Sequence, residues 1–154
     1  MKIRLTFISG GQTGVDRATL DFALEHFIPC AGWCPKGRLA EDGKIDQKYP
    51  LQETITSAYP ERTEKNILDS DGTLILNMEG IMDQGTQYTI ELSRIHKKPF
   101  LIIDMSRDQK RRATEIRVWL KKEKITILNI AGARESNSPG IYEKTGKFLE
   151  KLLI

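Results

Sequence analysis

Two short glycine-containing loops carry the residues of this chain whose types and spacing suit the binding of an anion. The first loop follows an apolar run and consists of Ser9, Gly10, Gly11, Gln12, Thr13 and Gly14. The second loop, Asp83-Gln84-Gly85-Thr86, comes after another apolar run at residues 73–76. Loops at the carboxyl ends of parallel strands are where open α/β sheets hold phosphate-bearing ligands. We therefore interpret the two loops as parts of one binding site.

The first loop has the features of an anion cradle without matching a common nucleotide-binding signature. Its glycines allow a positive φ and let backbone N–H groups approach a ligand closely. A helix is expected to begin near Val15 and Asp16, so that its positive end faces the same point. The spacing Gly10-Gly11-x-x-Gly14 is neither GxGxxG nor a Walker A loop. A tight strand-to-helix turn without a ligand is the alternative, and the second loop favours binding.

The second loop opens a helix whose first turns supply further polar groups. Thr86 is a natural N-cap, and this ordinary capping role is the alternative to ligand binding. Together with the first loop, Gly85, Thr86 and Thr89 can offer backbone and hydroxyl donors to a phosphate. Glu91 follows on the next turn as a candidate carboxylate.

Three basic residues are candidates for charged contacts with the same anion. Lys36 and Arg38 flank a glycine next to a strand end, and Arg62 lies in a helix that begins near residue 61. Arginine binds phosphate or carboxylate through two parallel N–H bonds. A solvated surface side chain is the alternative for Arg62. A polar loop at residues 129–136 follows the last strand, and a ligand contact and a surface connection are equally open for it.

The cysteines and histidines do not have the spacing of a metal site. Cys30 and Cys34 are four residues apart, whereas His26 and His96 are isolated in the sequence. Zinc sites need paired ligands at short spacings, so we expect no metal held by side chains. Because Cys34 has no visible base partner in the sequence, we expect two reduced cysteines without a nucleophilic role.

The elements that must position these residues alternate along the chain. Apolar runs predict strands at residues 3–8, 29–33, 73–76, 100–103 and 125–130. Helical periodicity predicts helices at residues 15–27, 61–70, 86–96, 109–122 and from 141 onwards. Right-handed crossovers between such units predict one three-layer Rossmann-like α/β domain, residues 1–154, with a mostly parallel five-stranded sheet between helices on both faces. The irregular stretch at residues 34–59 is the exception, and its length is typical of a functional or mobile loop.

The composition excludes several classes of partner. The 154 residues include 24 Lys and Arg against 21 Asp and Glu, a net charge of +3. This excess is too small to indicate nucleic-acid binding, and the basic run at residues 107–124 is typical of the solvated face of an amphipathic helix. No apolar run reaches the ~20 residues of a membrane span, and no cleavable leader pattern precedes the first strand. We expect a cytoplasmic protein that contacts neither nucleic acid nor membrane.

Several longer motifs resemble those of the molybdenum carrier family. They are GGQTGVDRA at residues 10–18, GWCPKGR at 32–38, the segment 61–66, the triplet 69–71 and the loop 129–136. The resemblance covers nearly the whole chain and implies a Rossmann-like superfamily shared with LOG-type (lysine-decarboxylase-like) nucleotide phosphoribohydrolases. In the register of those enzymes, an arginine matches Arg62, a Ser-Asp pair matches Ser70-Asp71, and the loop keeps Gly85-Thr86. Their catalytic glutamate falls at Thr89, with Glu91 most of a turn away.

The resemblance implies binding of the molybdenum cofactor, a pterin with a phosphate tail whose own dithiolene holds the metal. The residues favour a binding protein for a phosphorylated small molecule, and they do not select the pterin over a nucleotide. One alternative is a nucleoside 5'-monophosphate phosphoribohydrolase that uses Arg62 with Glu91 or Asp16, although Thr89 replaces the catalytic glutamate. Another is a nucleotide-sensing or scaffolding module. The superfamily also implies a homo-oligomer.

Overall fold

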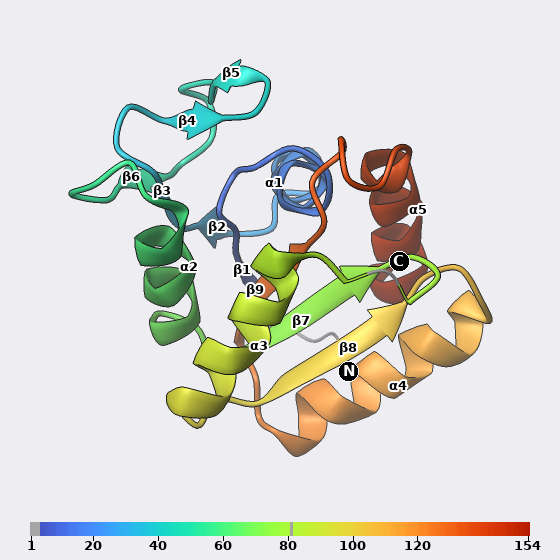
Figure 1. Ribbon diagram of the computed structural model, residues 1–154. Helices are drawn as coiled ribbons and strands as arrows, with labels where there is room; N and C mark the ends of the chain where they lie inside the picture. The colour runs from blue at the N-terminus through green and yellow to red at the C-terminus, as the bar shows by residue number, and fades with distance from the viewer. Residues whose placement is uncertain (1–3, 81) are drawn as a thin grey trace.

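The computed structural model describes residues 4–80 and 82–154 and folds them around a five-stranded sheet (Figure 1). All the strand pairs of this sheet are parallel, in the order β2-β1-β9-β7-β8. The strands are β1 Thr6–Ile8, β2 Cys30–Ala31, β7 Gly72–Asn77, β8 Phe100–Asp104 and β9 Ile127–Gly132. Strand β7 is buried along its whole length, as expected for a strand covered on both faces.

Helices cover both faces of the sheet (Figure 1). They are α1 Val15–Glu25, α2 Tyr59–Leu68, α3 Gln84–Ile95, α4 Gln109–Lys122 and α5 Ile141–Leu153. Helix α5 packs against α1 and α4 in one layer, whereas α2 packs against α3 in the other. Within the described residues, no helix has both the length and the apolar character that crossing a membrane requires. The three-layer Rossmann-like α/β fold predicted from the sequence is confirmed.

The predicted elements agree with the observed ones in type and order, and they differ at their ends. Helix α2 begins two residues earlier than predicted because Pro60 occupies its first turn, where a missing N–H has no cost. Helix α1 stops at Glu25, and Phe27 takes a positive φ of 56° beyond it. The strand predicted at residues 3–8 begins with a residue that lies outside the described part of the chain.

The stretch predicted to be irregular, residues 34–59, is an ordered excursion from the main sheet. In it β3 Trp33–Cys34 pairs with β6 Gln52–Glu53 in parallel, while β4 Leu39–Ala40 and β5 Gly43–Lys44 form an antiparallel hairpin. A second small core lies between the excursion and α1, composed of Leu20, Cys34, Ile45, Tyr49 and Leu51. Strands of two residues leave no measurable periodicity, which is why the sequence did not predict them.

The guanidinium of Arg38 lies at the centre of this excursion, and the residue is only 5% exposed. Its nitrogens donate to the carbonyl oxygens of Ile45, Asp46, Tyr49 and Leu51 at 2.7–3.1 Å. Four of the five N–H donors of an arginine are therefore used by the backbone. The prediction that Arg38 contacts an anionic ligand is wrong, because its side chain holds the excursion together instead.

Arg38→Ala is expected to open the excursion, because four backbone carbonyls lose their buried donor. An unsatisfied buried polar group costs about 1–3 kcal/mol, so the free energy of unfolding should fall by at least about 2 kcal/mol. Limited proteolysis should then cut residues 35–58 faster than in the wild type. Lys36→Ala, which removes a neighbouring exposed side chain, is the control. Equal protease resistance of the two variants would contradict this role of Arg38.

Candidate functional site

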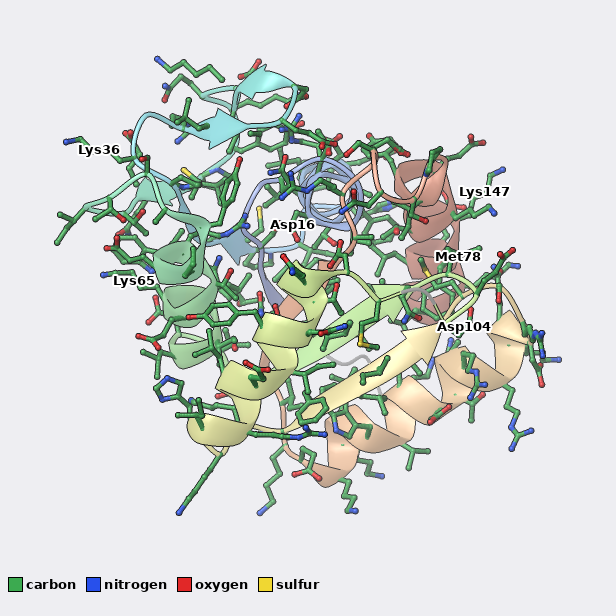
Figure 2. The ribbon with its side chains drawn as sticks, in the orientation of Figure 1. Asp16, Lys36, Lys65, Met78, Asp104 and Lys147 are labelled. Carbon is green, nitrogen blue, oxygen red and sulfur yellow. The ribbon has the colours of Figure 1, made fainter. Side chains whose placement is uncertain are left out.

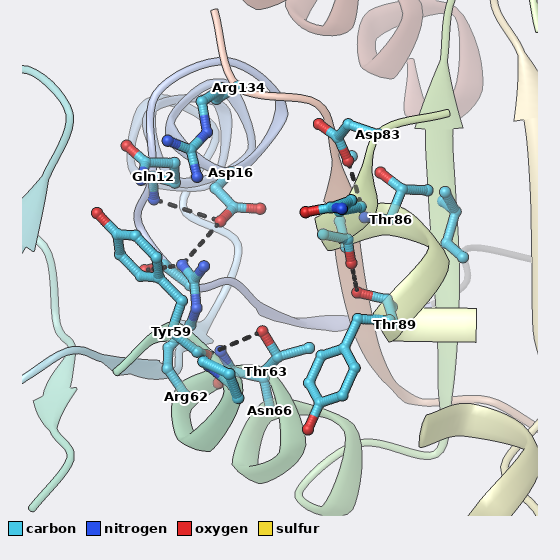
Figure 3. Close-up of a pocket in the computed structure, with 18 of the residues that line it drawn as sticks. Gln12, Asp16, Tyr59, Arg62, Thr63, Asn66, Asp83, Thr86, Thr89 and Arg134 are labelled. Atoms are coloured by element: carbon cyan, nitrogen blue, oxygen red, sulfur yellow. Dashed lines mark hydrogen bonds and ion pairs between the residues drawn. The ribbon is translucent and has the colours of Figure 1, made fainter. Parts of the chain in front are cut away.

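A cavity of about 690 Å³ opens at the carboxyl edge of the sheet, beside β7 and β9 (Figure 3). The helix that follows β9 lies in one layer and the helix that follows β7 lies in the other. The loops after these two strands therefore diverge, and ligands of open α/β sheets bind at such a point. The volume lies within the range of about 300–1,000 Å³ that is usual for small-molecule sites.

The structure brings seven of the candidate residues to this cavity. They come from the first glycine loop, α1, α2 and the start of α3, and they are Gly10, Gln12, Asp16, Arg62, Gly85, Thr86 and Thr89. Both glycine loops thus line the same cavity. The other candidates do not line the cavity. Some of them hold the first loop in place, and the others lie in other parts of the molecule.

A buried ion pair between Arg62 and Asp16 forms one wall of the cavity (Figure 3). The Nη1 atom of Arg62 lies 3.5 Å from Asp16 Oδ2 and donates a 3.1 Å hydrogen bond to the Gly10 carbonyl. Each side chain is 12% exposed. A Cβ at Gly10 would lie 2.5 Å from Arg62 Nη1, so only glycine lets the guanidinium rest on this loop. The pair joins α2 to the first loop and to α1.

The carboxyl of Asp16 is a proton-exchanging group in this wall. Burial raises its pKa to about 6, although Arg62, the Gln12 N–H and Arg17 all favour the charged form. The Gln12 N–H donates to Asp16 Oδ2 at 3.3 Å. A pKa in this range lets the carboxyl gain or lose a proton near neutral pH, as acid-base groups of functional sites do.

The first loop is stabilised by hydrogen bonds among its own residues. The N–H groups of Gly11, Gln12 and Thr13 donate to Ser9 Oγ, Asp16 Oδ2 and Gln12 Oε1 respectively. The Ser9 hydroxyl in turn donates to the Asp16 carbonyl at 2.9 Å. Gly11 and Thr13 lie outside the cavity lining, so the structure does not bring these two residues to the cavity as predicted.

Two further segments hold the first loop from outside the cavity. Glu41, at the tip of the β4–β5 hairpin, accepts hydrogen bonds from the Thr13 hydroxyl and from the Ser136 hydroxyl. Gly14, with φ of 80°, packs against the backbone after β9, and a Cβ there would lie 2.3 Å from the Ala133 carbonyl oxygen. Thr13 and Gly14 therefore shape the loop, and neither lines the cavity.

The second loop is organised by Asp83. Its Oδ1 accepts the Thr86 N–H at 2.8 Å, and its Oδ2 accepts from Asn137 Nδ2 at 3.1 Å. The N-cap of α3 is therefore Asp83, and the prediction of Thr86 as N-cap is wrong by one turn. Burial would raise the pKa of Asp83, but these hydrogen bonds outweigh it and hold the pKa below its ordinary value. The Thr89 hydroxyl donates to the Gly85 carbonyl at 3.0 Å.

Two predicted site residues lie away from the cavity. Lys36 is exposed at the outer edge of the excursion, whereas Asp16 lies in the middle of the molecule (Figure 2). Glu91 is exposed on α3 and does not line the cavity. The predicted roles of Lys36 as an anion ligand and of Glu91 as a site carboxylate are therefore wrong for this cavity, because neither side chain reaches it.

Sequence reasoning missed Tyr59, whose ring lies close to two guanidinium groups. The Cζ atoms of Arg62 and Arg134 are 5.2 Å and 5.5 Å from its ring centroid. Arg134 belongs to the polar loop at residues 129–136, for which a ligand role was left open, and it now lines the cavity. The signal for Tyr59 was weak, since it lies where the irregular stretch meets a helix.

The surroundings of the two cysteines disfavour the thiolate form of their side chains. Burial raises the pKa of both the Cys30 and the Cys34 thiol. Across residues 4–80 and 82–154, no cluster of three or more His, Cys, Asp or Glu side chains has the geometry to hold a metal ion.

Comparisons with known proteins agree with the motifs and the fold. A model of the circularly permutated YpsA SLOG family matches residues 7–153. The chain belongs to this family. A crystal structure from Syntrophus aciditrophicus SB, named "Putative molybdenum carrier protein", is 49% identical in sequence, with a TM-score of 0.96 over 100% of this chain and 98% of that one. No curated protein shows a significant match. SLOG membership and this likeness support a ligand-binding role.

In this SLOG protein, Asp16→Asn is expected to raise the free energy of unfolding near neutral pH. Because the pKa of Asp16 is about 6 in the folded state and 3.8 when the side chain is fully solvated, stability should fall as the pH rises from about 4 to about 6. Removing the buried charge should then stabilise the protein by about 2–3 kcal/mol near pH 7 and change little near pH 4. Urea unfolding of both proteins at the two pH values measures the difference. A variant that is no more stable than the wild type near pH 7 would contradict the prediction.

Proposed function

We propose that this cavity binds a phosphorylated small molecule and that the protein acts as a molybdenum cofactor carrier. The observation that carries the proposal is one cavity lined by both glycine loops and by two arginines, Arg62 and Arg134. Arg62 Nε and Gln12 Nε2 have no hydrogen-bond partner among the described residues. A buried donor left unpaired costs about 1–3 kcal/mol, so either side chain would gain by turning this donor toward a bound anion. Arg134 lines the same cavity and supplies a second positive charge near Tyr59.

The lining residues fit a pterin that carries a phosphate. The two guanidinium groups suit the phosphate, and two tyrosines, Tyr59 and Tyr88, also line the cavity. Since the described residues contain no metal-ligating cluster, the metal would be held by the dithiolene of the ligand itself. A nucleotide offers the same combination of phosphate and flat ring, and it is the second ligand class that we propose to test. We also expect the protein to be cytoplasmic and to form a homo-oligomer.

Arg62→Ala is expected to weaken ligand binding ten- to hundredfold, because a charge-assisted hydrogen bond contributes about 1.5–3 kcal/mol. Calorimetric titration of the wild type and the variant with molybdenum cofactor, AMP and GMP measures this. Arg62→Lys should lie between them, since lysine keeps the charge and loses the planar fork.

Arg112→Ala is the matched control for this titration. Arg112 also pairs with a carboxylate, Glu115 at 3.0 Å, but it lies on α4 away from the cavity. The Arg112→Ala variant should bind each of the three ligands with the affinity of the wild type. If wild type and Arg62→Ala bind equally well, Arg62 is not part of the site. If none of the three ligands binds the wild type, the proposed function fails.

A second candidate function is favoured by the raised pKa of Asp16. A protonated Asp16 could donate its proton to the departing base while water attacks the anomeric carbon, giving free base and ribose 5-phosphate from a nucleoside monophosphate. Chromatographic detection of adenine after incubation with AMP tests this reaction. Asp16→Asn should abolish release, and Glu91→Gln should leave it unchanged because Glu91 lies outside the cavity. Tight binding of AMP without release of adenine would exclude this reaction and would leave ligand binding as the proposed function.

A further inference from the structure

The carboxylate of Asp16 occupies the donors that a bound phosphate would need. Its Oδ2 accepts the Gln12 N–H at 3.3 Å and lies 3.5 Å from Arg62 Nη1. Both distances exceed the roughly 2.7–2.9 Å of a strong charge-assisted hydrogen bond. Asp16 also lies in the first turn of α1, where the helix end favours a negative charge. The chain's own carboxylate is therefore held, loosely, where an anionic ligand would be stabilised.

The charged groups around Asp16 come from every element that packs against it. Arg62 faces it from α2, and Arg17 lies next to it on α1. Asp83, on the second loop, adds a negative charge that opposes ionisation of Asp16. Arg134, on the loop after β9, acts on Asp83. A dianion that enters the cavity thus meets two carboxylates beside the two arginines that attract it.

On the basis of the proposed function, we propose that the cavity takes up its anionic ligand together with one proton, which resides on Asp16. Once protonated, Asp16 no longer repels the ligand and no longer competes for Arg62 Nη1 and the Gln12 N–H. Its O–H then donates to a ligand oxygen. Two anionic groups in such close contact share one proton for the same reason that paired carboxylates do.

The burial of Asp16 supports this proton uptake. With 9% of its surface exposed, the residue has lost most of the water that would stabilise its charge. Burial raises its pKa to about 6, so the proton costs little near neutral pH, and a nearby anion raises the pKa further. Asp16 thereby determines which charge state of a ligand the cavity accepts. Ligands that bring their own proton on a phosphate oxygen should bind without uptake from solvent.

Inorganic sulfate is a suitable probe, because its charge stays at −2 across the relevant pH range, whereas phosphate esters titrate. Calorimetric titration of the full chain in two buffers with different ionisation enthalpies counts the protons taken up per sulfate. Near pH 8 we expect close to one proton per sulfate, and an affinity that falls about tenfold for each pH unit above the pKa of Asp16. Asp16→Asn should bind sulfate at least about tenfold more tightly near pH 8, without pH dependence.

Asp42→Asn provides the matched control. Asp42 also pairs with an arginine, Arg17 at 2.9 Å, but it lies outside the cavity lining. This variant should keep the proton uptake and the pH dependence of the wild type. Both substitutions replace a carboxylate with an amide, so the two variants differ only in the position of that change.

Three results would overturn the inference. They are sulfate binding near pH 8 without proton uptake, weaker sulfate binding near pH 8 by Asp16→Asn than by the wild type, and no sulfate binding near pH 5, where Asp16 should be protonated and Arg62 free. Failure of the proposed function looks different. In that case the phosphorylated ligands do not bind, or they bind equally to Arg62→Ala, whatever the pH.

Discussion

The ion pair between Arg62 and Asp16 is the contact on which the site depends. It crosses the carboxyl edge of the sheet and joins α2, in one helix layer, to α1, in the other. A buried pair of this kind gains little net stability, because the desolvation of both charges offsets their attraction. The pair instead fixes the position of the Arg62 guanidinium on the cavity wall. It also places there the Asp16 carboxyl, which loses its charge when it takes up a proton.

The excursion between β2 and α2 determines the shape of the first glycine loop. Arg38 satisfies the carbonyls inside the excursion, and Glu41 at the hairpin tip binds the loop and the segment after β9 at once. The small core around Ile45 and Leu51 lies directly under Gly11, where a Cβ would come within 2.6 Å of a Leu51 methyl group. The absence of a side chain at these glycines thus allows close packing of the loop at least as much as it allows a ligand to approach the backbone.

The distribution of charge in the cavity differs from that implied by the LOG-type register. At the position of the catalytic glutamate, Thr89 donates its hydroxyl to the Gly85 carbonyl and brings no charge. The carboxyl groups near the cavity come instead from α1, with Asp16, and from the N-cap of α3, with Asp83. Hydrogen bonds lower the pKa of Asp83 whereas burial raises that of Asp16, so the two carboxyl groups exchange their protons in different pH ranges.

The sequence by itself determined the alternation of strands and helices, the parallel sheet and the meeting of the two glycine loops, because hydrophobic periodicity and strand polarity are local properties. It also singled out Arg62 and Asp16, whose neighbours in the chain form long motifs. Only the tertiary structure decided that Arg38 is buried among carbonyls, that Glu91 faces away, and that Tyr59 and Arg134 complete the cavity. Those outcomes depend on contacts between segments far apart in the chain, and the protonation of Asp16 depends on burial, which no spacing of residues encodes.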